Sequence, residues 1–246
     1  MNRYVLKFYK DGYVKYTSHL DLLRIFKRSF KKTGLALQYS QGFNPHPKMG
    51  FAQPLSLGYS SKCELIEFET LENHDPADIL QKMKDVLPEG LEPVSCVRFE
   101  SNIKSLAGEA DSAEYVVWAP LPESAAADWN NDVLTGKISD YLAQTEITAM
   151  KRQKKTKKLA PVDIRKMIRG MQGMVVTDVE GRKALMLNLH LDCGSTSNLS
   201  PELVISTFLP FCSLDIERYD VEVERKTLKF VKNLQFSLLT QNLPVL

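Results

Sequence analysis

The chain has 246 residues, of which 43% are hydrophobic and 25% are charged, and its formal net charge at pH 7 is only +2. These values are ordinary for a globular protein and exclude a disordered chain over most of the length. The near-neutral net charge means that affinity for nucleic acid has to come from local clusters of basic residues. No run approaches the ~18 apolar residues of a membrane span and the N-terminus lacks the apolar core of a signal peptide, so we expect a cytoplasmic protein.

The cysteine pattern argues against disulfides and iron–sulfur clusters. Cys63, Cys96, Cys193 and Cys212 are scattered without a CxxC spacing, which predicts buried free thiols. The sequence also lacks grouped metal ligands, a phosphate-binding glycine loop and a nucleophile elbow. We therefore predict no metal site, no cofactor and no catalytic residue.

The first hundred residues predict a regular alternation of elements. Residues 3–10 alternate as a strand, which residues 13–16 extend after an Asp-Gly turn. Ser18 is a typical capping residue, and apolar residues at helical spacing predict a helix that ends at Gly34. The other predicted elements are strands over 35–39, 63–69 and 91–100 and a helix that opens at Asp75-Pro76 and stops at 88–90.

The second half of the chain repeats this order. The predicted elements are strands over 115–118, 146–150, 183–191 and 215–226 and helices over 124–142 and 200–208. A small, polar segment at 101–113 separates the two halves and is typical of a linker. The apolar tail at 233–246 is compatible with a swapped segment, a docking segment or a poorly ordered end.

The order strand, helix, strand, strand, helix, strand is that of the split βαβ, ferredoxin-like fold. We therefore predict an α+β protein of two tandem ferredoxin-like units with antiparallel sheets, one over residues 1–100 and one over residues 114–232. The second unit has a basic insertion between its second and third strands. Two helices cover one face of the sheet in such a unit, and the other face is free for a partner.

The segment 40–52 (SQGFNPHPKMGFA) is dense in residues that fix the shape of the backbone. Pro45 and Pro47 restrict φ, and a glycine on either side permits positive φ. A stiff loop loses little entropy on binding, so we interpret it as a recognition loop, with a plain connector as the alternative. The residues predicted to bind here are Tyr39, Gln41, Gly42, Phe43, Asn44, His46 and Lys48.

Basic residues form two further clusters. On the first predicted helix, which carries His19 at its start, Arg24, Lys27 and Arg28 share one face that no acidic residue after Asp21 neutralises. The second cluster lies in the insertion and consists of Lys151, Arg152, Lys154, Lys155, Lys157, Lys158 and Arg165. Uncompensated clusters of this kind favour a polyanion as ligand, although a solvated charged surface is the alternative interpretation.

The run 39–58, YSQGFNPHPKMGFAQPLSLG, and the preceding helix SHLDLLRIFKRSFKKTGL closely resemble a bacterial family, the radical-SAM-associated domain of unknown function. The resemblance covers about residues 1–100 and extends more weakly to the motif PVDIR at 161–165. Members of the family occur alone or fused to the C-terminus of a radical-SAM protein with a cobalamin-binding region. The resemblance implies a radical-SAM protein as partner, because this chain has no cluster motif of its own.

These observations predict an RNA-binding or substrate-presenting accessory protein that works with a radical-SAM enzyme in RNA modification. RNA is favoured over duplex DNA because the sequence shows no recognition helix or zinc finger, while Tyr39, Phe43 and Phe51 are suited to stacking on bases. Two alternatives stay open. One is a stand-alone endoribonuclease or transferase that uses His19 and His46 for acid–base chemistry, and the other is an adaptor that binds only protein.

Overall fold

The computed structural model describes residues 2–99, 105–153 and 156–231, and the chain divides into two compact units. Unit 1 comprises Met1–Asp111 together with Arg225–Leu246, and unit 2 comprises Ser112–Glu224. The last strand therefore passes from unit 2 into unit 1, whereas the sequence suggested a second unit that runs on to residue 232. The predicted tail at 233–246 and part of the predicted linker lie outside the described residues.

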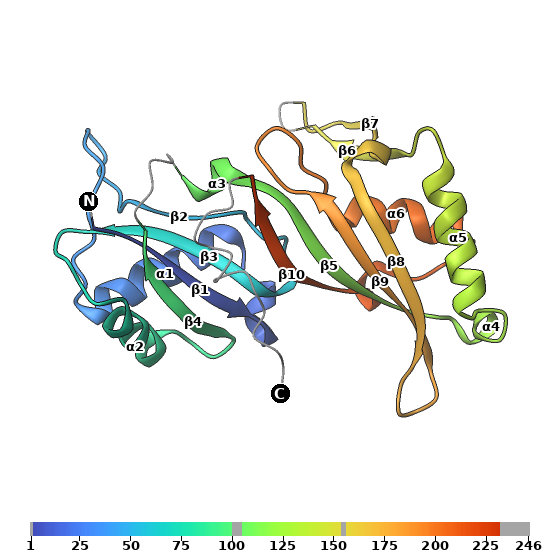
Figure 1. The fold of residues 1–246 in the computed structure, drawn as a ribbon, viewed down its shortest axis with the longest axis horizontal. Helices are drawn as coiled ribbons and strands as arrows, with labels where there is room; N and C mark the ends of the chain where they lie inside the picture. The colour runs from blue at the N-terminus through green and yellow to red at the C-terminus, as the bar shows by residue number, and fades with distance from the viewer. Residues whose placement is uncertain (1, 100–104, 154–155, 232–246) are drawn as a thin grey trace. The chain divides into compact units, whose positions relative to one another are not determined.

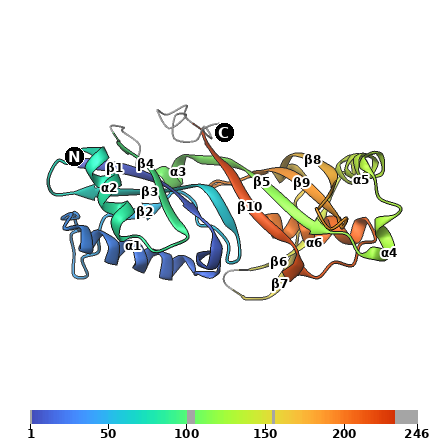
Figure 2. The same ribbon diagram turned by 90° about the horizontal axis from the view of Figure 1, so that it is seen from below.

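Unit 1 is built on an antiparallel sheet with the strand order β4-β1-β3-β2 (Figure 1). The strand β10 (Glu222–Phe230) also neighbours β3 in this order. The other elements are β1 (Asn2–Lys10), the 3-10 helix η1 (Gly12–Tyr16), α1 (His19–Thr33), β2 (Met49–Phe51), β3 (Ser60–Thr70), α2 (Pro76–Val86), β4 (Leu91–Arg98) and α3 (Leu106–Glu109). Helices α1 and α2 pack on one face of this sheet (Figures 1 and 2).

Helix α1 forms where the sequence predicts it. The Ser18 side chain accepts a hydrogen bond from the amide of Asp21, and Gly34 ends the helix at a φ of 73°. Phe26 and Phe30 are fully buried, and the Phe30 ring lies 4.5 Å from that of Phe68 on β3. Burial of aromatic rings against the sheet fixes the rotation of the helix about its axis, so its opposite face is turned to solvent.

Two predicted strand segments of unit 1 differ from the structure. Residues 13–16 form η1 instead of extending β1, because Asp11 caps a turn in which Gly12 has a positive φ of 60°. Residues 35–39 contribute only isolated bridges. Besides β1 and β10, the strand that pairs with β3 is β2, which lies inside the predicted loop. The edge of the sheet is therefore formed by the 40–52 segment itself.

Unit 2 contains the antiparallel strand order β5-β9-β8 and a separate two-stranded sheet of β6 and β7. Its elements are β5 (Ala110–Pro120), α4 (Glu123–Ala126), α5 (Asn131–Ala143), β6 (Thr148–Arg152), β7 (Leu159–Asp163), η2 (Arg165–Met167), β8 (Ile168–Thr177), β9 (Lys183–Asp192), α6 (Pro201–Phe211) and η3 (Arg218–Asp220). Tyr141 of α5 packs edge-on against Phe208 of α6, with ring centroids 5.1 Å apart. No helix among the described residues is both long and apolar enough to span a bilayer.

The insertion in unit 2 sits elsewhere than predicted. Residues 146–150 were expected to form the second strand of the sheet, but residues 148–152 form β6, which pairs with β7 in the basic hairpin. In the main sheet β9 pairs with β5 on one side and with β8 on the other. The sequence patterns do not indicate β8. The hairpin is thus inserted between α5 and β8, before the second strand of the main sheet.

Candidate functional site

One face of α1 is basic and turned to solvent. Helical spacing places Arg24, Lys27, Arg28 and Lys31 together on the side opposite the buried phenylalanines, and we call these four residues the basic face. Three of them are exposed and Lys27 is half-buried. Among the described residues, the carboxylate paired with this face is Asp21, whose Oδ1 accepts from Nη1 of Arg24 at 2.6 Å. The excess of positive charge predicted here is therefore accessible.

Asp21 is itself held by the start of the helix. Ser18 donates a hydrogen bond to its carboxylate, and this bond, followed by the one from Arg24, lowers the pKa of Asp21. The carboxylate therefore serves the N-terminal turn of α1, where negative charge is favourable. It compensates one arginine at the start of the basic face and leaves the rest of that face uncompensated.

The 40–52 loop is closed by hydrogen bonds across its base. The backbone amide of Ser40 donates to the carbonyl of His46 at 2.9 Å, and the amide of His46 donates to Oγ of Ser40 at 3.1 Å. The same hydroxyl lies 3.0 Å from Nδ1 of His46. Phe43 is fully exposed at the tip and Tyr39 is about half exposed, so both rings are available for stacking.

Two predicted contacts of the loop are occupied within the protein. Phe51 is buried in the core at 7% exposure, so the stacking role expected for it is wrong. Lys48 donates from Nζ to Oε2 of Glu69 at 2.9 Å and lines a cavity of 210 Å³ beside Arg3 and Glu67. The ammonium of Lys48 is thus paired with a carboxylate, which reduces its value for binding an anion.

The two histidines considered for acid–base chemistry have different neighbours. His19 stacks edge-on against Phe51, with ring centroids 5.4 Å apart. His46 is held by Ser40 at the base of the loop. Within the described part of the chain no contact joins the two imidazoles. Each imidazole therefore has its own partner within the protein, Phe51 for His19 and Ser40 for His46.

The basic hairpin belongs to unit 2. Lys151, Arg152, Lys157 and Lys158 are exposed, whereas Lys154 and Lys155 lie outside the described residues. Nε of Arg152 donates to the carbonyl of Lys157 at 3.0 Å, which closes the hairpin, and Lys151 reaches a backbone carbonyl at 3.4 Å. The hairpin therefore presents several cations on a short two-stranded sheet.

Arg165 and the PVDIR motif have structural partners. Nε of Arg165 donates to the carbonyl of Leu142 at 2.7 Å, at the C-terminal end of α5, where a cation is favourable. Asp163 accepts from the amides of Arg165 and Ile147, and these two bonds lower its pKa. The binding role predicted for Arg165 thus competes with a contact that joins the hairpin to α5.

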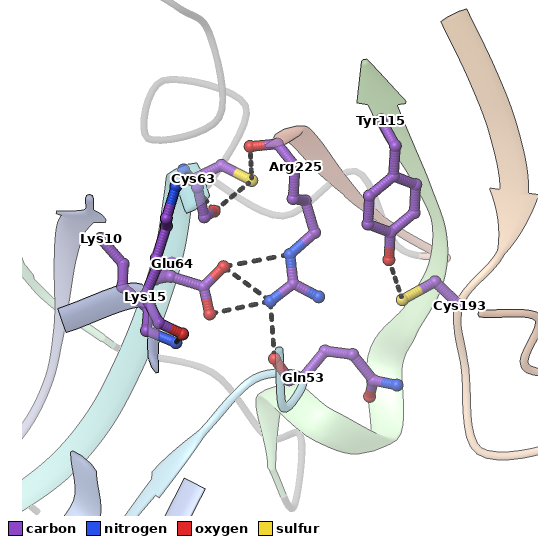
Figure 3. A network of polar contacts seen from close by, with 9 residues as sticks. Lys10, Lys15, Gln53, Cys63, Glu64, Tyr115, Cys193 and Arg225 are labelled. Carbon is purple, nitrogen blue, oxygen red and sulfur yellow. Dashed lines mark hydrogen bonds and ion pairs between the residues drawn. The ribbon is translucent and has the colours of Figure 1, made fainter. Parts of the chain in front are cut away.

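Figure 3 shows a buried ionic network in unit 1 that the sequence did not reveal. Arg225 of β10 donates to the carboxylate of Glu64 through Nε and Nη2, and also to the carbonyl of Gln53 at 2.8 Å. Lys10, at 1% exposure, donates to the carbonyl of Lys15 in η1 at 3.2 Å. Glu64 lies in the predicted strand 63–69, whose pattern does not distinguish a buried glutamate from an exposed one.

Sequence patterns also missed two exposed tyrosines in front of the basic face. Tyr13 is 96% exposed and Tyr16 is 63% exposed, both in η1. The available signal was the Asp11-Gly12 pair followed closely by the helix cap at Ser18, which leaves little room for a strand.

Comparison with known proteins gives a family and no activity. No curated protein matches the chain. Among solved structures, the chain is similar to one in the crystal structure of a Cbf5-Nop10-Gar1 complex, with 12% identity, a TM-score of 0.47 and coverage of 92% of this chain and 48% of that one. It thus spans about half the length of that protein. A crystal structure of an unknown protein from Galdieria sulphuraria matches with 12% identity, a TM-score of 0.26 and coverage of 94% and 99%. The model of a bacterial family described as an uncharacterized conserved protein (DUF2344) matches residues 3–201, and the chain belongs to that family.

Proposed function

We propose that this protein binds RNA and presents it to a radical-SAM enzyme for modification. The observation that carries the proposal is the basic face of α1, where four cations, three of them exposed, have one carboxylate partner among the described residues. Such a face is stabilised when a polyanion displaces the counterions around it. The neighbouring 40–52 loop adds the exposed ring of Phe43, and the half-exposed ring of Tyr39 lies directly before it in the chain. Both rings suit unpaired bases better than a duplex.

The fold that we propose for this task is a pair of ferredoxin-like units. In unit 1 the strand order β4-β1-β3-β2 with two helices on one face is the order of the split βαβ motif. In unit 2 the strands β5, β9 and β8 follow the corresponding order, with α5 between β5 and β8 and α6 after β9. Both units then offer helix faces and strand edges to ligands from a rigid scaffold.

The proposed partner rests on the family resemblance together with the state of the cysteines. Burial raises the pKa of the Cys63 and Cys96 thiols to about 12. Cys63 and Cys193 are buried, and Cys96 is half-buried. Protonated, buried thiols make poor ligands for iron. In the proposed complex the enzyme contributes the cluster and the chemistry, and this chain contributes the RNA.

The alternative of a stand-alone nuclease or transferase has less support. His46 is engaged by Ser40, and His19 packs on Phe51. General acid–base catalysis would need both imidazoles within reach of one substrate. We therefore propose binding and presentation of RNA, without cleavage, as the role of this chain.

A purification without nuclease, followed by ultraviolet crosslinking, tests the proposal. RNA should remain with the protein, and mass spectrometry should find crosslinked nucleotides on peptides from α1 and from the 40–52 loop. A matched control region is α2, which carries the exposed residues Lys82 and Lys84. Protein that is free of nucleic acid and that binds no labelled single-stranded RNA at low salt would overturn the proposal.

A further inference from the structure

Two solvent-exposed tyrosines directly precede α1, the helix that carries the basic face, in the chain. Tyr13 is 96% exposed and Tyr16 is 63% exposed, although the rest of unit 1 has a well-formed core. Both belong to η1, the single turn between β1 and α1. Leu20, in the first turns of α1, is also 63% exposed and lies between these rings and Arg24 along the chain. Large exposed rings grouped in one short segment are a sign of an interaction surface.

The backbone that carries these rings is fixed from several sides. The carbonyl of Lys15 accepts from the amide of Gly58 at 2.8 Å and from Nζ of Lys10 at 3.2 Å. The amide of Asp11 donates to the carbonyl of Gly90 at 2.9 Å. A Cβ atom at Gly90 would lie 2.5 Å from the carbonyl oxygen of Asp11. The turn that precedes β4 therefore approaches the backbone of Asp11 as closely as a glycine allows. The segment η1 is thus docked on unit 1 with little freedom to move.

One of these anchors is a buried charge. Lys10 is 1% exposed, and burial lowers the pKa of its ammonium, while the nearby carboxylate of Glu64 acts in the opposite direction (Figure 3). Taking an ammonium out of water is costly unless it is hydrogen-bonded and compensated. The Lys10 ammonium donates a hydrogen bond to the backbone carbonyl of Lys15 in η1, the turn that holds the exposed tyrosines. Rigid presentation of the two rings is the feature that this arrangement achieves.

Cationic groups continue from the tyrosines along α1. The ammonium of Lys15 lies 5.4 Å from the ring centroid of Tyr16. Beyond Leu20, the basic face runs along the same side of the helix through Arg24 and Arg28. Aromatic rings on a fixed backbone, combined with cations, are the two features by which proteins bind a single strand, through stacked bases and neutralised phosphates.

We propose that η1 is a stacking platform for unpaired bases of a single-stranded RNA whose phosphates follow the basic face of α1. The inference rests on the proposed function and adds to it the form of the substrate and the residues that contact the bases. A single strand is favoured over an acidic protein because the exposed rings of Tyr13 and Tyr16 suit stacking on unpaired bases. It is favoured over a duplex because stacked base pairs leave no open faces for the rings.

The test compares three variants of the full chain against a labelled oligouridylate and a labelled RNA duplex. The double variant Tyr13→Ala/Tyr16→Ala removes the platform, and Tyr13→Phe/Tyr16→Phe keeps the rings without the hydroxyl groups. Tyr219→Ala is the matched control, because Tyr219 is 81% exposed and lies in unit 2. Loss of a stacked base should weaken binding about fivefold to 100-fold, so the alanine pair should lose affinity for the single strand. The phenylalanine pair and the control should bind as the unaltered protein does.

The outcomes separate this inference from the proposed function. If the unaltered protein binds the oligouridylate and the alanine pair binds it equally well, the platform is wrong while RNA binding stands. If the unaltered protein binds neither RNA, both proposals fail. A preference of the unaltered protein for the duplex overturns the platform. The platform is also wrong if the alanine pair loses binding of an acidic peptide but keeps binding of the oligouridylate. Circular dichroism and retained hydrogen-exchange protection in β1 show that the variants are folded.

Discussion

The guanidinium of Arg225 donates from Nε at 3.0 Å and from Nη2 at 2.6 Å to Oε1 of Glu64, a residue 161 positions earlier in the chain. The two side chains are only 1% and 3% exposed. A buried guanidinium needs a carboxylate in matching geometry, because an unpaired charge in the interior is strongly unfavourable. This pair therefore ties the C-terminal part of β10 to unit 1.

Replacing Glu64 by Gln should destabilise unit 1 by about 3–5 kcal/mol, because it leaves Arg225 and Lys10 buried without their carboxylate. Arg225→Met should cost less, since Glu64 then keeps the ammonium of Lys10 nearby. Hydrogen exchange of the amides in β1 and β3 reports opening of unit 1 directly. Equal protection in Glu64→Gln and the unaltered protein would show that the pair contributes nothing.

Alkaline pH should weaken the fold through Cys63. Burial raises its pKa from 9.0 to about 12, so the folded protein keeps a proton that the unfolded chain loses above pH 9. Stability contributed by this group is therefore complete below about pH 9 and is lost as the pH rises towards 12. Relative to Cys63→Ala, the free energy of unfolding of the unaltered protein should decrease by about 1 kcal/mol between roughly pH 8 and 10. Denaturant unfolding at the two pH values measures this, and a constant difference would contradict it.

The loop should contribute to RNA binding through His46. In His46→Asn, a hydrogen-bonding side chain of similar reach remains, but the imidazole, which could transfer a proton, is removed. We expect affinity for single-stranded RNA to fall by about 1–3 kcal/mol or less, with no change in the pH profile of a coupled modification reaction. Titration by fluorescence anisotropy gives the affinity. A coupled rate that falls by roughly two to four orders of magnitude with unchanged affinity would instead make His46 a general acid or base.

The partner can be sought directly. A tagged form of this chain should co-purify with a protein that carries an iron–sulfur cluster, which its visible absorbance and iron content identify. The isolated chain should leave RNA unmodified, and addition of the partner should produce modified nucleosides in digests examined by mass spectrometry. Turnover of RNA by the isolated chain would contradict the accessory role.

Elements with strong local signals were predictable from the sequence. The helix α1 carries its cap at Ser18, its stop at Gly34 and its phenylalanines at helical spacing, and each has the predicted role. The basic face followed from the same periodicity. The α+β class with a mostly antiparallel sheet followed from the order of the elements.

The missed elements depend on contacts that are distant in sequence. Strand β8 contains Gly173, which weakens any strand signal, but a Cβ there would lie 2.9 Å from Leu187 and 3.1 Å from Leu134. Close packing of this position against β9 and α5 favours a residue without a side chain, which no local pattern records. Likewise β2 is hidden within a proline-rich loop and is defined by its pairing with β3. Tyrosine favours strands, so propensity predicts a strand at Tyr13, whereas the turn at Asp11 and Gly12 places this residue in η1.

The central claim is that the basic face of α1 binds the RNA backbone, and the salt dependence of binding tests it most directly. The variant Arg24→Glu/Lys27→Glu/Arg28→Glu is compared with Lys82→Glu/Lys84→Glu, which reverses exposed charges on α2. The logarithm of the binding constant for a single strand decreases linearly with the logarithm of the salt concentration. The magnitude of this slope decreases by roughly 0.7 for each phosphate contact that is lost. The account predicts that the magnitude of the slope is smaller by about 2 for the α1 variant and is unchanged for the α2 control. An α1 variant that binds single-stranded RNA with the slope of the unaltered protein would contradict the claim.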